Sequence, residues 1–564
     1  MRIVVVGGVA GGMSCAARAR RLDESAEIVV LERGAHVSFA NCGLPYFVGG
    51  EIVEAGKLLV QTPESLRAAL DLDVRPGHDV TGIDTQRHLV SVHNADGWDE
   101  LHYDALVLAP GAAAIRPAIP GIDSARVHTV RSVEDAVRLR DRVTAGSARR
   151  AVVLGAGFIG LEVAEALAQR GLAVTVVELA DHVLPPLEQE LAHRVEAELD
   201  RLGITVRTGV PATAIQPGGA EDAVRLADGS TVAADLIVLS VGVRPDTEFV
   251  RAAGIRCDSA GAIVVDEHGR TSAPAVWAVG DAVVSRHAVS GIRRPVALAG
   301  PANRAGRLVA DDIIRPGSAR PLPDPVGTAI VRVGRLTIAL AGANRADLHR
   351  SGIAFSTVHL HPNQHAGYFP GAAQLHLLLH VANDDGRVLG AQAVGPDGVD
   401  RRIDVLATAI RAGLPVGDLI DLDLAYSPPY GQAKDAVNLA GMVGSNVLDG
   451  TLRLWYPEQV DDVLTRALVL DVRSPEEVAT GTLPGALTIP HTELRERLDE
   501  VRAAADDRPV RVLCASGVRS ALAHRVLAQS GFDSASLSGG MLTLRDWLGA
   551  DADTLLVTAE PAHA

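Results

Sequence analysis

Two segments of the chain begin in the same way, and this duplication restricts the possible folds more than any other feature. IVVVGGVAGGMSCAARARR, from residue 3, is followed by EIVVLER, and AVVLGAGFIGLEVAEALAQR, from residue 151, is followed by AVTVVEL. In each copy an apolar strand runs into a glycine turn, an apolar helix follows, and a second strand ends on an acid, Glu32 or Glu178. The duplication predicts an α/β protein with two Rossmann-like nucleotide-binding domains.

The second copy has the full glycine pattern of a dinucleotide site. Gly155 permits a tight turn, Gly157 admits a pyrophosphate against the backbone, and Gly160 lets the helix approach the strand. Glu178 can accept a hydrogen bond from a ribose hydroxyl and would repel a 2′-phosphate, which favours NADH over NADPH without excluding NADPH. The other residues that we expect at this site are Phe158, Ile159 and Gly242.

The first copy departs from the pattern, because Val9 stands where the middle glycine would be. A distant segment, TSAPAVWAVGDAV at residues 271–283, compensates for this departure. It resembles the second flavin-binding motif of the FAD-dependent pyridine nucleotide-disulfide oxidoreductases, in which the Asp, here Asp281, bonds the ribityl chain. The resemblance implies contacts with FAD from Gly7, Gly8, Ala10, Gly11, Gly12, Glu32, Arg33, Asn41, Cys42, Val80, Ala109, Gly111, Asp281, Ala282 and Tyr426.

Cys42 is the expected redox centre. It lies in SFANCGLPYFVGG, and Phe47 occupies the position of the second cysteine in a Cys-x-x-x-x-Cys pair, so the second sulfur must come from outside. The motif resembles the single-cysteine site of the coenzyme A disulfide reductases, and the resemblance extends over about the first 445 residues. It implies a mixed disulfide of Cys42 with coenzyme A and hydride transfer from NADH to FAD. It also implies coenzyme A contacts from Ser14, Arg18, Arg21, Ser38, Asn41, Asn303 and Lys434.

A thiol with a pKa of about 8.5 is only slightly ionised at neutral pH, so attack on sulfur requires stabilisation of the thiolate. We expect backbone N–H donors or the flavin to supply it, because a helix dipole contributes only about 0.3 to 1 kcal/mol. Tyr368 and Tyr426 match positions that reach the partner subunit's cysteine in this family, which implies a homodimer.

The C-terminal part of the chain is expected to form a separate small α/β domain. LDVRSPEEVATGTLPGALTIP and the loop CASGVRS resemble a rhodanese module. In this loop successive N–H groups would surround the Cys514 sulfur, Arg519 would add positive charge, and the product would be a persulfide. The expected domains are FAD-binding at 1–112 and 245–322, NAD(P)H-binding at 113–244, an α+β dimerisation domain at 323–447 and rhodanese at 458–556.

Composition limits the possible partners. The 53 Lys and Arg against 69 Asp and Glu give a formal charge of −16, with no basic run that suits nucleic acid. No apolar stretch reaches the length of a membrane span, and the start of the chain leaves no room for a signal peptide, so a cytoplasmic protein with small-molecule substrates is expected. His359, His361 and His365 lie in what we interpret as a Pro/Gly-rich loop without an accompanying acid, so no metal site is expected.

These features lead to the hypothesis of an FAD-dependent enzyme that uses NADH to reduce coenzyme A disulfide, coenzyme A persulfide or polysulfide, with sulfane sulfur handled at Cys514. NADH oxidase or peroxidase activity is the alternative, although Ala10 stands where those relatives have a histidine. A flavoprotein scaffold that reports the nicotinamide state is a third hypothesis. Cys15 and Cys257 are expected to be structural, and the tail TAEPAHA is expected to be frayed.

Overall fold

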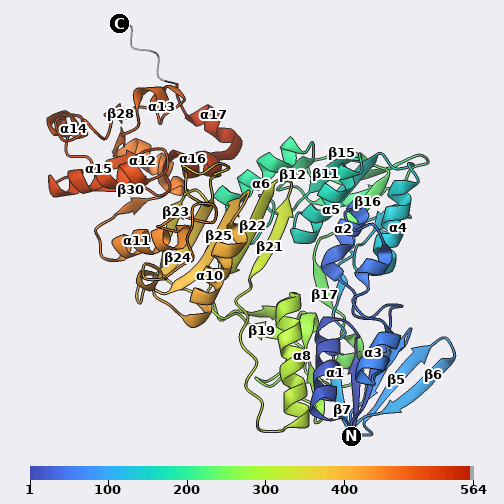
Figure 1. Cartoon of the computed structure of the whole chain (residues 1–564). Coiled ribbons are helices and arrows are strands. Elements are labelled where there is room, and N and C mark those ends of the chain that lie inside the picture. Colours follow the sequence, from blue (N-terminus) through green and yellow to red (C-terminus); the bar gives the residue numbers. More distant parts are fainter. Residues whose placement is uncertain (559–564) are drawn as a thin grey trace. The chain divides into compact units, whose positions relative to one another are not determined.

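A computed structural model describes residues 1–558 of the chain. Within it the chain forms two compact units: residues 1–181 with 199–327, and residues 182–198 with the part from 328 onward (Figure 1). The mixed helices and parallel sheets of these units confirm the α/β class. The expectation for the C-terminal tail concerns mainly residues 559–564, which lie outside the described residues.

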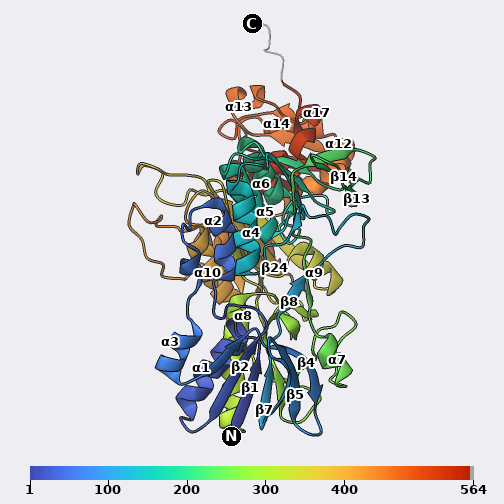
Figure 2. The same cartoon turned by 90° about the vertical axis from the view of Figure 1, so that its right-hand side faces the viewer.

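The first sheet of unit 1 is built around the first glycine motif. Its strand order is β18 (Val276–Ala278), β7 (Ala105–Leu108), β1 (Arg2–Val6), β2 (Glu27–Glu32) and β3 (Asp73–Pro76), all parallel. Ile3 and Val5 pack with helices α1 (Ala10–Leu22) and α8 (Ala299–Ile314) on one face. Val4 and Val6 belong to a core on the other face, with β4 (Asp79–Asp84) and β5 (Leu89–Asn94) (Figure 2). Burial on both faces explains the uninterrupted apolar run of β1.

The second sheet of unit 1 repeats this construction around the second glycine motif. Its order is β12 (Thr205–Arg207), β11 (Ala173–Val177), β10 (Arg150–Leu154), β16 (Leu236–Leu239) and β9 (Val127–His128), also parallel. Gly7 N donates to Leu31 O and Gly155 N donates to Val177 O, both at 2.8 Å. Each glycine turn therefore leaves its first strand in the same way, as the duplication predicts.

Shorter elements complete unit 1. Helix α2 (Leu44–Gly49) packs on α5 (Phe158–Gln169) and α4 (Val133–Thr144). The remaining helices and strands include α3 (Pro63–Leu70), α7 (Glu248–Ala252), β6 (Gly97–His102), β8 (Ala112–Ala114), β13 (Ala212–Gln216), β14 (Asp222–Leu226), β15 (Thr231–Ala234), β17 (Val243–Pro245), β19 (Val284–Arg286) and β20 (Arg293–Pro295).

Unit 2 contains an antiparallel and a parallel sheet. The antiparallel order is β21 (Ala329–Val333), β22 (Leu336–Gly342), β25 (Val388–Gly395), β24 (His376–Ala382) and β23 (Phe355–Leu360). Its helices are α6 (Gln189–Arg201, of which residues 189–198 belong to this unit), α9 (Arg345–Arg350), α10 (Val399–Ala412) and α11 (Ala436–Leu448).

The parallel sheet of unit 2 lies in the C-terminal part of the chain. Its order is β26 (Leu454–Trp455), β30 (Ser534–Leu537), β29 (Val510–Leu513), β27 (Leu468–Asp471) and β28 (Leu487–Thr488). The helices are α12 (Val460–Arg466), α13 (Pro475–Ala479), α14 (Leu498–Ala505), α15 (Val518–Gln529), α16 (Gly540–Leu548) and α17 (Ala552–Leu555). Strands alternate with helices here, as the sequence predicts.

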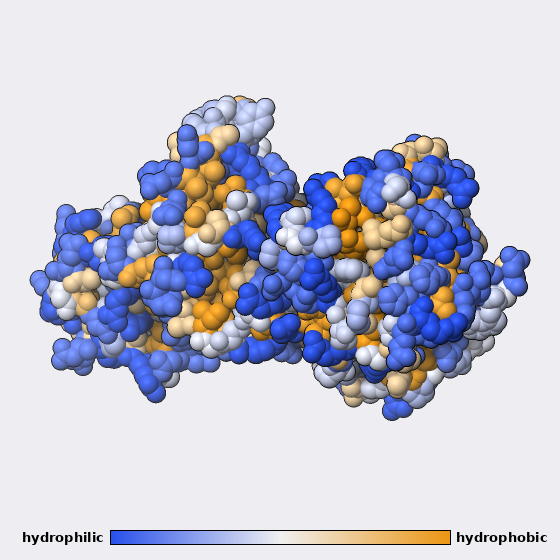
Figure 3. Space-filling view, turned by 90° about the horizontal axis from the view of Figure 1, so that it is seen from below, coloured by the Kyte–Doolittle hydropathy of each residue, from blue (hydrophilic) through white to orange (hydrophobic). Residues whose placement is uncertain are grey.

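The surface drawn in Figure 3 has apolar residues in separate patches among hydrophilic ones. Within residues 1–558, none of the helices combines the length and the apolar character that crossing a bilayer requires.

Candidate functional site

Both glycine turns have a shape that suits a nucleotide. A Cβ on Gly12 would lie 2.0 Å from Gly7 O, and one on Gly160 would lie 2.1 Å from Gly155 O, so only glycine permits this close packing of helix on turn. Gly7 and Gly155 have φ of +99° and +101°, values that favour glycine. Both turns therefore have the close packing of helix on turn that a dinucleotide site requires.

At the second turn, the space for a pyrophosphate is open. A Cβ on Gly157, the N-cap of α5, would meet no atom within 4 Å, in contrast to Gly155 and Gly160. Phe158 and Ile159 form the first turn of α5. The Glu178 carboxylate accepts from Ala156 N at 2.6 Å and from Ala180 N at 2.9 Å, which fixes it at the end of β11. Each oxygen keeps a second lone pair for a ribose hydroxyl.

The residues predicted to contact FAD come from several strand ends of unit 1. The Glu32 carboxylate accepts from Gly8 N and Gly34 N, both at 2.8 Å. Asp281, in a short 3₁₀ turn after β18, pairs with Arg131 at 3.1 Å. Arg33 forms an ion pair with Asp246. The remaining predicted FAD contacts are placed as follows: Ala10 and Gly11 begin α1, Val80 is on β4, Ala109 and Gly111 follow β7, and Ala282 follows Asp281. Gly242, which is expected at the second glycine turn, precedes β17.

Cys42 lies on a 3₁₀ turn, Asn41–Gly43, between β2 and α2, and its residue is exposed. The loop that leads to it is held beside the first glycine turn, because Ser38 N donates to Gly8 O at 2.9 Å. Ser38 has φ of +45°, a left-handed conformation that is unusual for serine. The Asn41 Oδ1 atom is buried and has no hydrogen-bond partner within the described part of the chain. A buried oxygen without a hydrogen bond is energetically unfavourable, and a bound ligand that donates a hydrogen bond to Asn41 Oδ1 would remove this penalty.

The polypeptide around Cys42 disfavours the thiolate. Although the residue is exposed, the surrounding protein partly desolvates its sulfur and so raises the pKa of the Cys42 thiol, and the carboxylate of Glu162 raises it further. Glu162 belongs to α5 and accepts from the hydroxyl of Tyr46 on α2 at 3.0 Å. The sequence around Cys42 gives no indication of Glu162, because only the packing of α2 on α5 brings this helix of the second nucleotide motif close to Cys42.

Three of the predicted coenzyme A contacts lie together on helices α1 and α8. Ser14 Oγ donates to Asn303 Oδ1 at 2.8 Å, and Arg18 binds the Asp311 carboxylate at 2.7 Å. The charge of Arg18 is therefore compensated by a carboxylate. Arg21, one turn further along α1, instead donates a hydrogen bond to the neutral Ala17 carbonyl. Helices α1 and α8 pack so closely that a Cβ on Gly306 would lie 2.1 Å from Gly11 O.

The predicted tyrosines meet on unit 2. The hydroxyl groups of Tyr368 and Tyr426 are 3.3 Å apart, and the residues are 77% and 48% exposed. Phe369 and Tyr430 are also exposed beside them in sequence, and Lys434 is exposed a few residues before α11. A group of exposed aromatic residues is typical of a protein–protein interface.

Cys514 follows strand β29 and is completely buried. Its Sγ accepts from Gly517 N at 3.2 Å and lies 3.3 Å from Ser520 Oγ. Arg519 forms two hydrogen bonds with the Glu477 carboxylate, at 2.7 and 2.6 Å, and these bonds lower the pKa of Glu477 to about 2. The arginine thus holds the loop to helix α13 as well as placing a cation near the thiol. Ser520 was not predicted.

The other two cysteines have surroundings that suit the core. Cys15 is completely buried, and burial raises the pKa of its thiol to about 12. Cys257 is half-buried and pairs in an isolated bridge with Ile263.

The interpretation of the histidine segment was wrong for His359. This residue lies on strand β23, and its Nε2 is 2.9 Å from an acid, Glu190 Oε1. The acid is 169 residues away in sequence, so the local pattern gave no indication of it. Within residues 1–558 no group of three or more His, Cys, Asp or Glu side chains is arranged to hold a metal ion.

Family models match three successive parts of the chain. Residues 1–305 match the pyridine nucleotide-disulphide oxidoreductase model, residues 328–437 match its dimerisation domain, and residues 455–545 match the rhodanese-like domain. The first match alone covers more than half of the chain. The chain belongs to the pyridine nucleotide-disulphide oxidoreductase family. This oxidoreductase carries a rhodanese-like domain at its C-terminal end, as the sequence predicts.

Individual relatives match all of this chain or its first four fifths. The coenzyme A disulfide reductase of Staphylococcus epidermidis is 34% identical over 442 residues, which cover 78% of this oxidoreductase and 99% of the relative. Reduced CoADR-RHD of Bacillus anthracis superposes with a TM-score of 0.95 and 39% identity, covering 99% of both chains. An NAD-dependent persulfide reductase from A. fulgidus superposes with a TM-score of 0.89 and 38% identity, covering 96% of this chain and all of the other.

Proposed function

We propose that this oxidoreductase uses NADH to reduce coenzyme A disulfide, coenzyme A persulfide or a polysulfide through FAD and Cys42. One observation carries the proposal: a single exposed thiol lies on a loop that is bonded to the FAD-type glycine turn, next to the unpartnered Asn41 oxygen. No second cysteine lies nearby in the sequence, so the disulfide that forms must include an external thiol. The relatives named above act on such substrates.

The reaction balances with one nicotinamide for each disulfide. The Cys42 thiolate attacks one sulfur of coenzyme A disulfide, and one coenzyme A thiol leaves as the Cys42 mixed disulfide forms. FAD held at the first glycine turn would supply two electrons from NADH, and these cleave the mixed disulfide and release the second coenzyme A thiol. With a persulfide, attack on the sulfane sulfur or on the inner sulfur releases coenzyme A or sulfide instead.

We further propose that the enzyme is a homodimer in which Tyr368 and Tyr426 approach the partner subunit's Cys42. The exposed tyrosine pair and the match to a dimerisation domain support this arrangement. Phenol hydroxyl groups can donate hydrogen bonds to a departing thiolate. We place the enzyme in the cytoplasm, where NADH is available and where free cysteines such as its four described thiols stay reduced.

We propose the residues placed above as the binding sites for these molecules. FAD would contact the first glycine turn and Asp281, NADH the second turn and Glu178, and coenzyme A the group formed by Ser14, Arg18 and Asn303. The domain boundaries at residues 112, 245, 322 and 458 remain predictions. Cys514 would carry sulfane sulfur as a persulfide.

Replacement of Cys42 tests the redox proposal. Cys42→Ser should reduce turnover of coenzyme A disulfide with NADH by at least about a thousandfold, because the nucleophile is lost, while FAD remains bound. Cys257→Ser, which removes a half-buried thiol of the same unit, should leave turnover unchanged. Retained turnover in Cys42→Ser would refute the assignment. Faster reoxidation of the reduced wild-type enzyme by peroxide than by coenzyme A persulfide would favour the peroxidase alternative.

A further inference from the structure

The loop that carries Cys514 rests on the segment of residues 538–543, which follows β30 and begins α16. Met541 N donates to Cys514 O at 2.8 Å, and Leu542 N donates to Ala515 O at 3.0 Å. These bonds hold the carbonyl side of the loop, while Gly517 N on its other side points to the Cys514 sulfur. The packing is close, because a Cβ on Gly540 would lie 2.5 Å from Cys514 O. The position of the 538–543 segment therefore determines the surroundings of the sulfur.

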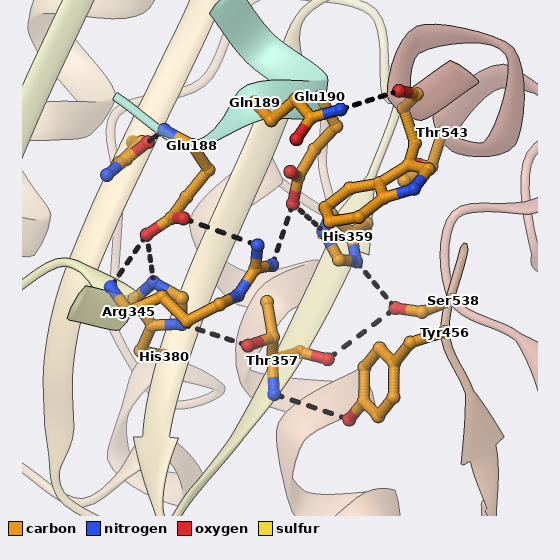
Figure 4. A network of polar contacts seen from close by, with 12 residues as sticks. Glu188, Gln189, Glu190, Arg345, Thr357, His359, His380, Tyr456, Ser538 and Thr543 are labelled. Carbon is orange, nitrogen blue, oxygen red and sulfur yellow. Dashed lines mark hydrogen bonds and ion pairs between the residues drawn. The ribbon is translucent and has the colours of Figure 1, made fainter. Parts of the chain in front are cut away.

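His359 on strand β23 and His361, the residue directly after this strand, contact this same segment. His359 Nδ1 lies 2.7 Å from Ser538 Oγ, as Figure 4 shows, and His361 Nε2 lies 2.8 Å from Thr543 Oγ1. Gly539 lies between these two contacts. A Cβ on it would lie 2.7 Å from the Cβ of His359 and 3.0 Å from Nε2 of His361. Strand β23 and the residue that follows it thus contact the segment at both of its ends.

The His359 ring is itself held in one orientation (Figure 4). Its Nε2 lies 2.9 Å from Glu190 Oε1, and Arg345 binds the same oxygen at 2.9 Å. Burial alone would raise the pKa of Glu190, but its contacts with His359 and Arg345 lower this pKa below the usual value. An ionised carboxylate only accepts hydrogen bonds, so Nε2 of His359 carries a proton and Nδ1 faces Ser538.

The His361 ring is fixed by a second histidine. Its Nδ1 lies 2.7 Å from His376 Nδ1. Burial, with a contribution from Arg194, lowers the pKa of His376 to about 3, and burial lowers the pKa of His361 well below its usual value. Both rings are therefore neutral at pH 7. One of the two Nδ1 atoms therefore donates a hydrogen bond to the other, and Nε2 of His361 forms a hydrogen bond with the Thr543 hydroxyl.

We propose that His361 with Thr543, and His359 with Ser538, are positioning residues for sulfur transfer at Cys514, so that the sulfurtransferase site extends into the antiparallel sheet. The inference rests on the proposed function of Cys514 as a carrier of sulfane sulfur. With thiosulfate as donor, the Cys514 thiolate attacks the outer sulfur, the S–S bond breaks and sulfite leaves. Cyanide then takes the outer sulfur of the Cys514 persulfide as thiocyanate and restores the thiolate.

Removal of the Thr543 hydroxyl in the full-length holoenzyme tests the proposal. Thr543→Val should lower kcat for sulfur transfer from thiosulfate to cyanide about tenfold, with KM for thiosulfate changed less than about twofold, because the loop rather than the substrate contact is disturbed. Alkylation of Cys514 by iodoacetamide, followed on its peptide by mass spectrometry, should slow in parallel. Thr543→Ser keeps the hydroxyl and should restore both rates. The matched control is Thr465→Val on α12, whose exposed hydroxyl donates to the Asp461 and Asp462 carbonyls of its own helix.

The outcomes separate this inference from the proposal on which it rests. If Cys514→Ala retains sulfur transfer, the proposed function of Cys514 is wrong. If Cys514→Ala abolishes transfer but Thr543→Val keeps the wild-type kcat and alkylation rate, the positioning inference alone is overturned. Equal losses in Thr543→Val and Thr543→Ser would also overturn it. Should near-ultraviolet circular dichroism show that Thr543→Val does not fold, His361→Gln, which keeps an amide near the Nε2 position, must outperform His361→Leu in kcat for the inference to stand.

Discussion

Cys42 is surrounded by groups that oppose its ionisation, although its proposed reaction requires a thiolate. Burial and the Glu162 carboxylate both raise the pKa of its thiol. Stabilisation of the thiolate by backbone N–H donors or by bound flavin must therefore exceed the cost that these two effects impose.

Replacement of Glu162 by a neutral residue tests whether its charge raises the pKa of Cys42. Glu162→Gln removes a negative charge but keeps an oxygen for the Tyr46 hydroxyl, so the pKa of Cys42 should fall and the thiolate fraction at pH 7 should rise. Alkylation of Cys42 in the holoenzyme should become about two to five times faster at pH 7, with the pH profile displaced to lower pH. Glu165→Gln, on the same helix and bonded to Gln169, is the control and should change neither. A profile that is unchanged or displaced to higher pH would show that the Glu162 charge does not act on Cys42.

At the scale of elements, the sequence correctly predicted the structures that depend on residues close together in the chain. The strand, glycine turn and helix around Gly155, and the loop between β29 and α15, follow from residues adjacent in sequence, because turn geometry and close packing require glycine at fixed spacings. His359 was misplaced in a loop, because prolines and glycines nearby suggested one. Its position on β23 is set by pairing with β24, and its role by Glu190 and Ser538, which no short-range pattern connects to it.

In the candidate site, too, residues within a recognisable motif could be predicted, whereas residues that act through contacts between elements could not. The single cysteine motif made Cys42 identifiable, and the family resemblance indicated Ser14 and Arg18, which lie on the same helix, α1. Glu162 and Ser520 could not be found in this way, since each acquires its role through contacts between elements. The binding of Arg18 to Asp311 also depends on the packing of α1 against α8.

At the scale of the whole molecule, the proposal requires two subunits for each reductase site. Mixed dimers distinguish this arrangement from one in which the tyrosines act within their own chain. We expect Cys42→Ser homodimers to be inactive and Tyr368→Phe/Tyr426→Phe homodimers to be slower than wild type, since the hydrogen-bond donors to the leaving thiolate are lost. Heterodimers of the two should recover about half of the wild-type kcat, because one site then combines a native cysteine with native tyrosines.

Heterodimer activity no higher than half that of the Tyr368→Phe/Tyr426→Phe homodimer would show that the tyrosines do not serve the partner's cysteine. Differently tagged chains allow the heterodimer to be purified, and wild-type chains carrying the same two tags provide the control for the effect of the tags.

The most direct test of the central claim is the mass of the protein after reaction with coenzyme A disulfide in the absence of NADH. The account predicts one coenzyme A per chain, attached to the peptide that contains Cys42, absent in Cys42→Ser and released on addition of NADH. An adduct on another cysteine, or an unmodified Cys42 after complete incubation, would contradict the account.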